Sequence, residues 1–225
     1  PGQAQHVDVD GREKHPDAGA EDALHRHPER RPRRRLHHQQ RRDRGEQRER
    51  ALGDMGGDPV NISRETLRSE AGAMSFRQDM LEKVVQLLGL LEALNGHPYL
   101  KGKFLLKGGT ALNLFMLDVP RLSVDIDLNY VGQAGKTAME AERPKLLEAM
   151  KSVFSREGLQ LGSRTRDDHA GTTMEIRYGS ALVGSGNLKV DVNFLSRVPL
   201  WPGLVLDSRP VGPGRATGLS VLDTH

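Results

Sequence analysis

The strongest repeat of apolar residues lies between Asp79 and Leu94. Positions 80, 81, 84, 87, 88, 91 and 94 are apolar and fall on one face of a helix with the usual helical period. The sequence Asn95-Gly96-His97-Pro98 then contains a glycine and a proline, which commonly end helices. A shorter helix is predicted to begin just after Ser63, because serine often caps the start of a helix.

Alternation of apolar and polar residues predicts strands in the following part of the chain. The longest strictly alternating segment runs from Arg121 to Val131. The further predicted strands are Phe104–Leu106, Leu159–Arg164, Thr172–Tyr178 and Asn187–Phe194.

Two more helical patterns lie between these strands. One runs from Thr110 to Leu117, and the other runs from Ala138 to Glu157 with an expected interruption near Pro144. The C-terminal part is rich in Pro and Gly and is expected to be irregular. Strands that alternate with helices in this way indicate an α/β (α+β) fold.

The composition changes near Pro59. Before it the chain is rich in Arg, His, Gln, Asp and Gly, and the first aromatic residue is Phe76. Such a segment cannot bury enough apolar surface to offset the loss of chain entropy on folding. Residues 1–58 are therefore predicted to be a disordered, low-complexity tail, and residues 59–225 a folded domain. Besides a mixed-charge tail without a specific partner, two interpretations stay open: Arg30 to Arg35 could bind RNA, or the segment could be translated from GC-rich DNA upstream of a natural start at Met55.

The overall composition excludes several classes of protein. The chain of 225 residues has no Cys, which excludes disulfide scaffolds, Cys-ligated zinc sites and thiol nucleophiles. No apolar run approaches the roughly 18 to 20 residues of a membrane span, and residues 1–10 show no secretory signal. The pI of 9.3 is typical of nucleic-acid-binding proteins, but the net charge is only +3. These features predict a cytoplasmic protein without a membrane partner.

A pair of glycines stands between the first predicted strand and a helix. In Lys107-Gly108-Gly109-Thr110, the glycines allow close approach to a ligand, and the free N–H groups of a helix start attract anions. The hydroxyl of Thr110 adds a further polar group. An ordinary tight turn into a helix explains the same residues, so this motif is weak by itself.

Acidic residues occupy the polar side of two predicted strands. In Ser123-Val124-Asp125-Ile126-Asp127, the two carboxylates project from one face, about 6.5 to 7 Å apart along the strand. Like charges so close repel unless a cation lies between them, and Mg²⁺ prefers such oxygen ligands. On the later strand, Lys189, Asp191 and Asn193 share one face, and Asp191 could complete a metal site or deprotonate an acceptor hydroxyl. Taken alone, each strand is also explained as an exposed polar face.

The order of these motifs is the plan of the polymerase-β-like nucleotidyltransferases. The segment KGGTALNLFMLDVPRLSVDIDLNYVG closely resembles the AbiEii/AbiGii nucleotidyltransferase toxins, whose hallmark is a GG-T/S-x-L helix start followed by R-x-S-x-D-[IV]-D. Arg121, Ser123, Asp125 and Asp127 match that hallmark, and the stretches LKVDVNF and RVPLW are also similar to the family. The resemblance covers about residues 60 to 225 and implies a nucleotidyltransferase-like mixed sheet flanked by helices.

The resemblance also implies an activity and a set of partners. It implies a toxin of a two-gene toxin–antitoxin pair that transfers a nucleotide from an NTP to an acceptor hydroxyl, on RNA such as a tRNA 3′ end or on protein. By this resemblance, Asp125, Asp127 and Asp191 would ligate Mg²⁺ and act in catalysis together with Lys189. The nucleotide would be bound by Lys107, Gly108, Gly109, Thr110, Arg121 and Ser123. The implied partners are the NTP, the acceptor and a cognate antitoxin.

The C-terminal end departs from the family pattern. Family members usually continue into a helix with the pattern E-L-x-A-x-K-x-x-A-L and an R-D-x-x-D segment, whereas this chain ends at Ser220 to His225. We therefore expect an incomplete domain with an exposed apolar sheet face and little activity. Two other functions stay open: a catalytically inactive remnant that only binds a partner, and a nucleotidyltransferase that modifies a small molecule of the antibiotic type.

Overall fold

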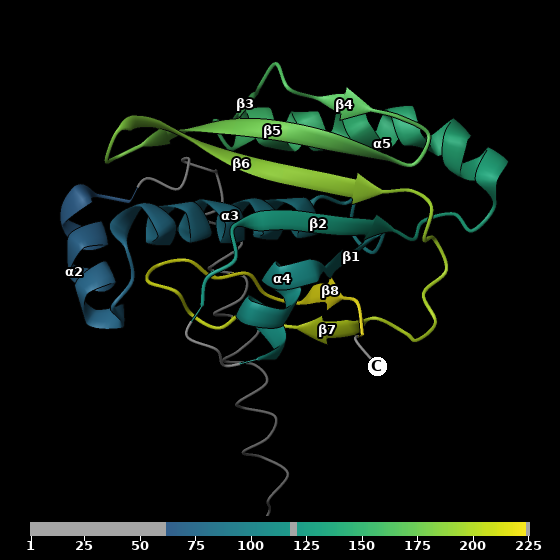
Figure 1. The fold of residues 1–225 in the computed structure, drawn as a ribbon. Coiled ribbons are helices and arrows are strands. Elements are labelled where there is room, and N and C mark those ends of the chain that lie inside the picture. The colour runs from purple at the N-terminus through teal and green to yellow at the C-terminus, as the bar shows by residue number, and fades with distance from the viewer. Residues whose placement is uncertain (1–61, 118–120, 224–225) are drawn as a thin grey trace, which may run out of the picture. The chain divides into compact units, whose positions relative to one another are not determined.

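The computed structural model describes residues 62–117 and 121–223, and these residues fall within one compact unit. The predicted tail, residues 1–58, lies outside the described residues. The described chain forms an eight-stranded sheet with helices packed against it (Figure 1). None of its helices is long and apolar enough to cross a membrane.

The sheet is mixed, as the family resemblance implied. Its strands lie in the order β3-β5-β6-β2-β1-β8-β7, and β4 also pairs with β5. The pairs β2–β6 and β1–β8 are parallel, and the other pairs are antiparallel. The strands are β1 (Phe104–Lys107), β2 (Asp125–Tyr130), β3 (Gln160–Leu161), β4 (Arg166–Asp167), β5 (Gly171–Ser180), β6 (Gly184–Asn193), β7 (Leu204–Leu206) and β8 (Leu219–Val221).

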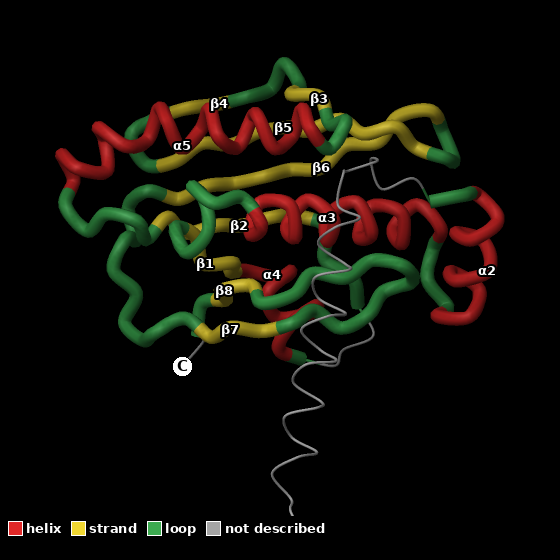
Figure 2. The backbone as a smooth tube through the Cα atoms, turned by 180° about the vertical axis from the view of Figure 1, so that it is seen from behind, coloured by secondary structure: helices red, strands yellow, loops and turns green. Residues whose placement is uncertain are grey.

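Two helices confirm the predictions made from the apolar pattern. The helix α2 (Arg64–Met74) begins after Ser63, whose hydroxyl oxygen accepts a hydrogen bond from the backbone N–H of Thr66. The helix α3 (Gln78–Gly96) covers the predicted amphipathic segment and ends where the glycine and proline were expected to stop it. Seen from behind the sheet, α3 and the helix α5 (Lys136–Arg156) lie in front of the strands (Figure 2).

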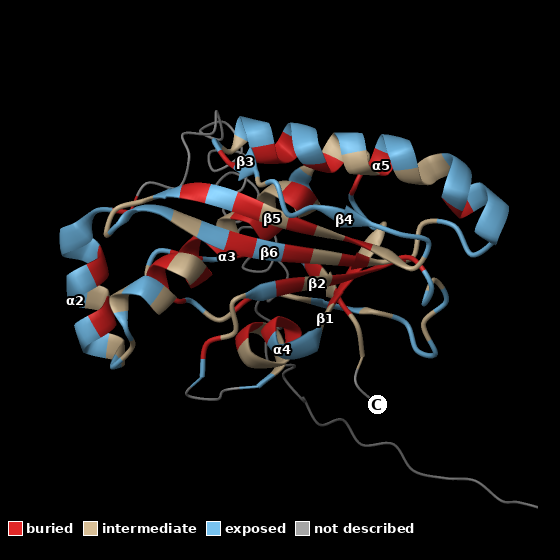
Figure 3. Ribbon diagram, turned by 45° about the horizontal axis from the view of Figure 1, so that its top comes forward, coloured by how far each residue is buried: buried red, intermediate tan, exposed pale blue. Residues whose placement is uncertain are grey.

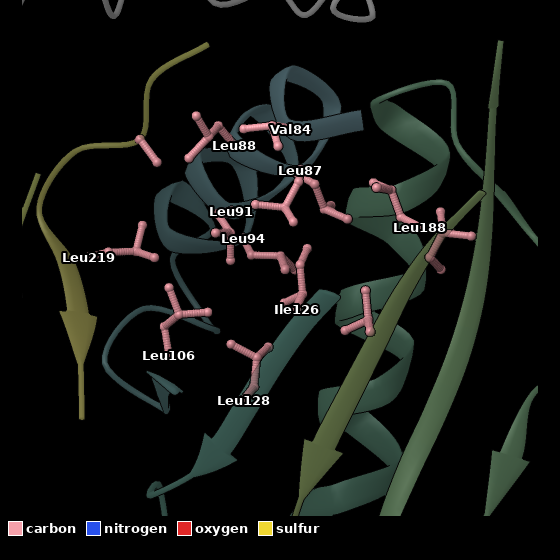
Figure 4. Close-up of a cluster of buried hydrophobic side chains, with 14 of the residues drawn as sticks. Val84, Leu87, Leu88, Leu91, Leu94, Leu106, Ile126, Leu128, Leu188 and Leu219 are labelled. Atoms are coloured by element: carbon pink, nitrogen blue, oxygen red, sulfur yellow. The ribbon is translucent and has the colours of Figure 1, made fainter. Parts of the chain in front are cut away.

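The core lies between these two helices and one face of the sheet. Leu87 and Leu91 of α3 point toward Ile126 and Leu128 of β2, and all four side chains are buried (Figure 4). On β5 and β6, buried and more exposed residues alternate along the strand (Figure 3). Because successive strand residues point to opposite faces, the polar members of this alternation lie on the face that α3 and α5 do not cover.

The predicted strand from Arg121 to Val131 is shorter than expected. It begins at Asp125, where its pairing with β6 begins opposite Lys189, whereas β1 reaches only as far as Asp127 before the chain turns into the short helix α4 (Gly108–Ala111). Residues 121–124 pair with neither strand. The predicted helix after the glycines begins at Gly108 and continues from Leu112 to Met116 as a π-helical segment.

The predicted interruption of the helix at Pro144 is wrong. The helix α5 runs through Pro144 without a break. Pro144 lies on the exposed side of α5, and so does Glu140, the residue whose carbonyl oxygen loses its helical partner. Water can solvate that oxygen, which explains why the helix tolerates the proline.

The C-terminal part is less irregular than its Pro and Gly content suggested. Its apolar segment Leu219–Val221 forms β8, which pairs with β1 through Leu106 and Val221, and β7 pairs with β8. Several large apolar side chains of this region are exposed, namely Leu195, Val198, Leu200, Trp201, Leu204 and Val205. The predicted strand Leu159–Arg164 is reduced to β3, and β4 follows it as a separate short strand.

Candidate active site

A row of polar side chains crosses five neighbouring strands in register. Lys107 of β1 pairs with Asp127 of β2, and Asp127 pairs with Asp191 of β6. Asp191 pairs with Thr173 of β5, and Thr173 pairs with Arg166 of β4. Residues that pair directly across strands point to the same face of a sheet. We call these five residues the cross-strand row.

The cross-strand row lines one cavity. The cavity has a volume of about 350 Å³, and all five residues of the row contribute to its wall. The remaining lining residues come from the turn between β4 and β5 and from the ends of β5 and β6, namely Asp168, Ala170, Gly171, Thr172, Val192 and Asn193. The sheet therefore presents two carboxylates between two cations at a single opening.

The charges of the row influence one another. Burial raises the pKa of the Asp127 carboxyl above its ordinary value, and the carboxylates of Asp191 and Asp125 raise it further, while Lys107 and Lys189 oppose them. Asp191 is held by two partners, because the ammonium of Lys189 lies 2.5 Å from it and the hydroxyl of Thr173 donates to it at 2.5 Å. That hydrogen bond to Asp191 is the main cause that raises the pKa of Lys189.

The two glycines bring the start of α4 close to this row. Gly108 has a φ of 73°, a conformation that favours glycine, and a Cβ atom there would lie 2.5 Å from Oδ2 of Asp127. A Cβ atom on Gly109 would lie 2.9 Å from the hydroxyl oxygen of Ser123. The space beside Gly108 is therefore taken by the Asp127 carboxylate and the space beside Gly109 by Ser123, so both positions favour a residue without a Cβ atom.

Of the predicted site residues, Lys107, Asp127 and Asp191 line the cavity, and the others lie beside it or away from it. Thr110 is fully buried, and its hydroxyl donates to the carbonyl oxygen of Asp125, so it connects α4 to β2 and does not line the cavity. Asp125 is exposed at the start of β2, opposite Lys189. Arg121 is exposed, and its carbonyl oxygen accepts a hydrogen bond from Arg209.

A comparison with models of protein families shows which family the chain belongs to. Residues 89–214, more than half of the chain, match the model of the AbiEii nucleotidyl transferase toxin, a type IV toxin–antitoxin system. The chain belongs to the AbiEii family. The match confirms the resemblance seen in the glycine and aspartate motifs, and the whole cross-strand row of this AbiEii chain lies within it.

Solved structures were compared with the chain as well. MenT4, a nucleotidyltransferase toxin from Mycobacterium tuberculosis H37Rv, matches with a TM-score of 0.47 and 20% sequence identity. The match covers 73% of this AbiEii chain and 56% of the MenT4 chain, so this chain spans little more than half the length of that toxin. No curated protein matches.

The carboxylates of the AbiEii chain suit a hard divalent cation in their chemistry. In the described part of the chain, no group of three or more His, Asp or Glu side chains is arranged to hold a metal ion. Asp127 and Asp191 nevertheless face each other across parallel strands, and their mutual repulsion contributes to the raised pKa of Asp127. A cation between them would relieve that repulsion, and carboxylate oxygens are the ligands that Mg²⁺ prefers.

Sequence reasoning missed the part of the cavity formed by β4 and β5. Thr173, Arg166 and the supporting residue Arg143 were not among the predicted site residues. Arg143 of α5 donates to a carboxylate oxygen of Asp167, to the carbonyl oxygens of Asp168 and Gly171, and to the hydroxyl of Thr172. The polar alternation along β5 was a signal for Thr173, but the pairing that places it beside Asp191 is not visible in one sequence.

Proposed function

We propose that this chain is a metal-dependent nucleotidyltransferase toxin that transfers a nucleotide from an NTP to an acceptor hydroxyl. The acceptor is RNA, such as a tRNA 3′ end, or protein, and a cognate antitoxin is the regulatory partner. The observation that carries the proposal is the pair Asp127 and Asp191, which face each other in register beside Lys107 in the cavity. Membership of the AbiEii toxin family supports it.

The proposal gives the following roles to the residues predicted from the sequence. Asp127 and Asp191 would hold Mg²⁺, with Asp125 close enough for its charge to act on Asp127. The ion would supply positive charge against the phosphate oxygens. Lys107 and the backbone at Gly108 and Gly109 bind the triphosphate, with Ser123 and Arg121 beside them. Thr110 has a positioning role, because its hydroxyl fixes the start of β2 against α4.

The reaction is an in-line displacement at phosphorus. The acceptor oxygen forms a bond to the α-phosphorus of the NTP while the bond from that phosphorus to the bridging oxygen breaks, and pyrophosphate leaves. The proton of the acceptor hydroxyl passes to a carboxylate. We assign this role to Asp191, because Lys189 and Thr173 already orient its oxygens.

The activity is tested with each of the four labelled NTPs and total RNA in the presence of Mg²⁺. We expect a low level of label transfer to RNA or protein, in keeping with the little activity expected from the sequence, and its loss on chelation of Mg²⁺ and in Asp127→Asn and Asp191→Asn. Label that is transferred only to a small molecule of the antibiotic type, and not to RNA or protein, would favour the antibiotic-type transferase. Binding of the antitoxin without any transfer would favour the inactive remnant.

The role of the glycines is tested at Gly109. A side chain there should block the close approach of phosphate, so Gly109→Val should weaken NTP binding about tenfold or more while the fold persists. Gly109→Ala is the milder variant, because the Ser123 hydroxyl that its Cβ would meet can rotate away. Gly179→Ala is the matched control, since a Cβ on Gly179 meets nothing within 4 Å. Unchanged NTP affinity in Gly109→Val would mean that the turn is only structural.

A further inference from the structure

Arg166 stands at the end of the cross-strand row and has no assigned role. It is exposed, lines the cavity, and has no hydrogen-bond or ion-pair partner among the described residues. Its neighbour Asp167, in contrast, is bound by Arg143. A guanidinium that lies in a cavity wall without a partner of its own is available to a ligand.

The backbone that carries Arg166 is fixed from two sides. Arg143 is largely buried, with 13% of its side chain exposed, and stacks at 4.3 Å over the ring of Phe194 while it binds the turn between β4 and β5. The carboxylate of Asp168 accepts the backbone N–H groups of Ala170 and Gly171 at 2.8 and 3.0 Å. Asp168 also lines the cavity, but these two bonds occupy one of its oxygens. The backbone on which Arg166 stands is therefore held in place by these hydrogen bonds.

The position of Arg166 places it on one side of the reacting groups. Lys107 and Arg166 are separated by four strand spacings, about 19 Å between backbones, with both carboxylates between them. In an in-line displacement, the attacking oxygen and the leaving group lie on opposite sides of the phosphorus. If the triphosphate binds beside Lys107 and Gly108, the acceptor approaches from the end of the row at which Arg166 lies.

The chemistry of Arg166 indicates which group of the acceptor it binds. The planar guanidinium offers paired donors that match a phosphate group bidentately. We propose that Arg166 binds a backbone phosphate of a nucleic-acid acceptor, and that Arg143 positions it. This inference rests on the proposed function, because that function places the NTP at the other end of the row.

The test uses the full chain and two binding measurements. Binding of a fluorescein-labelled single-stranded RNA 10-mer is followed by fluorescence anisotropy at several salt concentrations, and binding of each labelled NTP with Mg²⁺ is measured separately. Arg166→Gln should weaken RNA binding about tenfold and lower the slope of log affinity against log salt by about 0.7. Arg166→Lys should keep the salt slope and lose part of the RNA affinity, because lysine keeps the positive charge but lacks the paired donors of the guanidinium.

A neighbouring arginine provides the matched control. Arg164 is exposed in the same connection and does not line the cavity, so Arg164→Gln should leave RNA affinity and its salt slope unchanged. Equal losses in Arg164→Gln and Arg166→Gln would overturn the proposal, and so would unchanged RNA binding in Arg166→Gln or absence of RNA binding by the unaltered chain. If Arg166→Gln weakens NTP binding and leaves RNA binding intact, then Arg166 binds a phosphate of the NTP, and this result would also overturn the proposal. Failure of the unaltered chain to bind any NTP would count against the proposed function instead.

Discussion

At Asp127, the requirements of the site and of the fold oppose each other. Burial and two neighbouring carboxylates raise its pKa, so the folded protein binds the proton more tightly than the unfolded chain does. The stability gained from this group is present below the ordinary value of 3.8 and is lost as the pH rises through the raised pKa. At neutral pH, the ionised carboxylate therefore destabilises the fold when no cation is bound.

We predict that Asp127→Asn stabilises the metal-free protein while it removes activity. The expected gain at neutral pH is up to about 1 kcal/mol, or about 2 to 4 °C in the unfolding midpoint, because the amide removes a like charge opposite Asp191. Thermal unfolding with and without Mg²⁺ provides the measurement. Mg²⁺ should raise the midpoint of the unaltered chain and leave that of the variant in place. A lower midpoint for the variant without Mg²⁺ would show that the charge is favourable in the fold.

Single residues of the site differ in how far the sequence could identify them. The period of two along Asp125 to Leu128 and along Lys189 to Val192 correctly predicted which side chains share a face. The position of Thr110 could not be predicted, because its burial depends on the carbonyl oxygen of Asp125 fifteen residues further on. Arg166 could not be identified either, because its place in the row follows from pairings across five strands.

The helix α5 offers a prediction at the scale of an element. Pro144→Ala restores a backbone N–H that can bond to the exposed carbonyl of Glu140. We expect a gain of about 1 to 2 kcal/mol in the free energy of unfolding, since the restored bond and better helix propensity outweigh the larger entropy of the unfolded chain. Urea denaturation measures it. Thr137→Ala, at another exposed position of α5, gains only propensity, about half a kcal/mol. A loss of stability in Pro144→Ala would mean that the helix is shaped around the proline.

Elements with a strong internal pattern were predicted well, and elements defined by their neighbours were not. The apolar face of α3 is a property of its own residues, so its range was predicted closely. The start of β2 coincides with the start of its pairing with β6, opposite Lys189, and β8 is a strand because Val221 pairs with Leu106. Sequence patterns contain no information on such partners, which explains both errors.

For the whole molecule, the sequence indicated the fold class but not the order of the strands. The parallel pairing of β2 with β6 places Asp127 opposite Asp191, although more than sixty residues separate them in the chain. The resemblance to the AbiEii family implied that these carboxylates come together, whereas the alternation alone left each as an exposed polar face. The register of this pairing therefore provides the physical link between the sequence motif and the cavity.

The boundary predicted near Pro59 leads to a prediction for the whole chain. The described core begins with Ile62 and Leu67, which are 5% and 0% exposed, and Arg64 donates to the carbonyl oxygens of Ala181 and Leu182. A chain that begins at Pro59 keeps these contacts, so we expect its urea midpoint and its NTP affinity to equal those of the full chain.

A second deletion makes this comparison decisive. A chain that begins at Arg77 lacks α2, and with it the buried side chains of Ile62 and Leu67, each worth about 1.5 to 3 kcal/mol. Because a domain of this size is stable by only about 5 to 15 kcal/mol, this shorter chain should have a clearly lower urea midpoint. If the chain from Pro59 loses as much stability as the chain from Arg77, then residues 1–58 contribute to the folded domain and the predicted boundary is wrong. If both deletions leave the midpoint unchanged, α2 is an appendage, and the core that positions the carboxylates begins at α3.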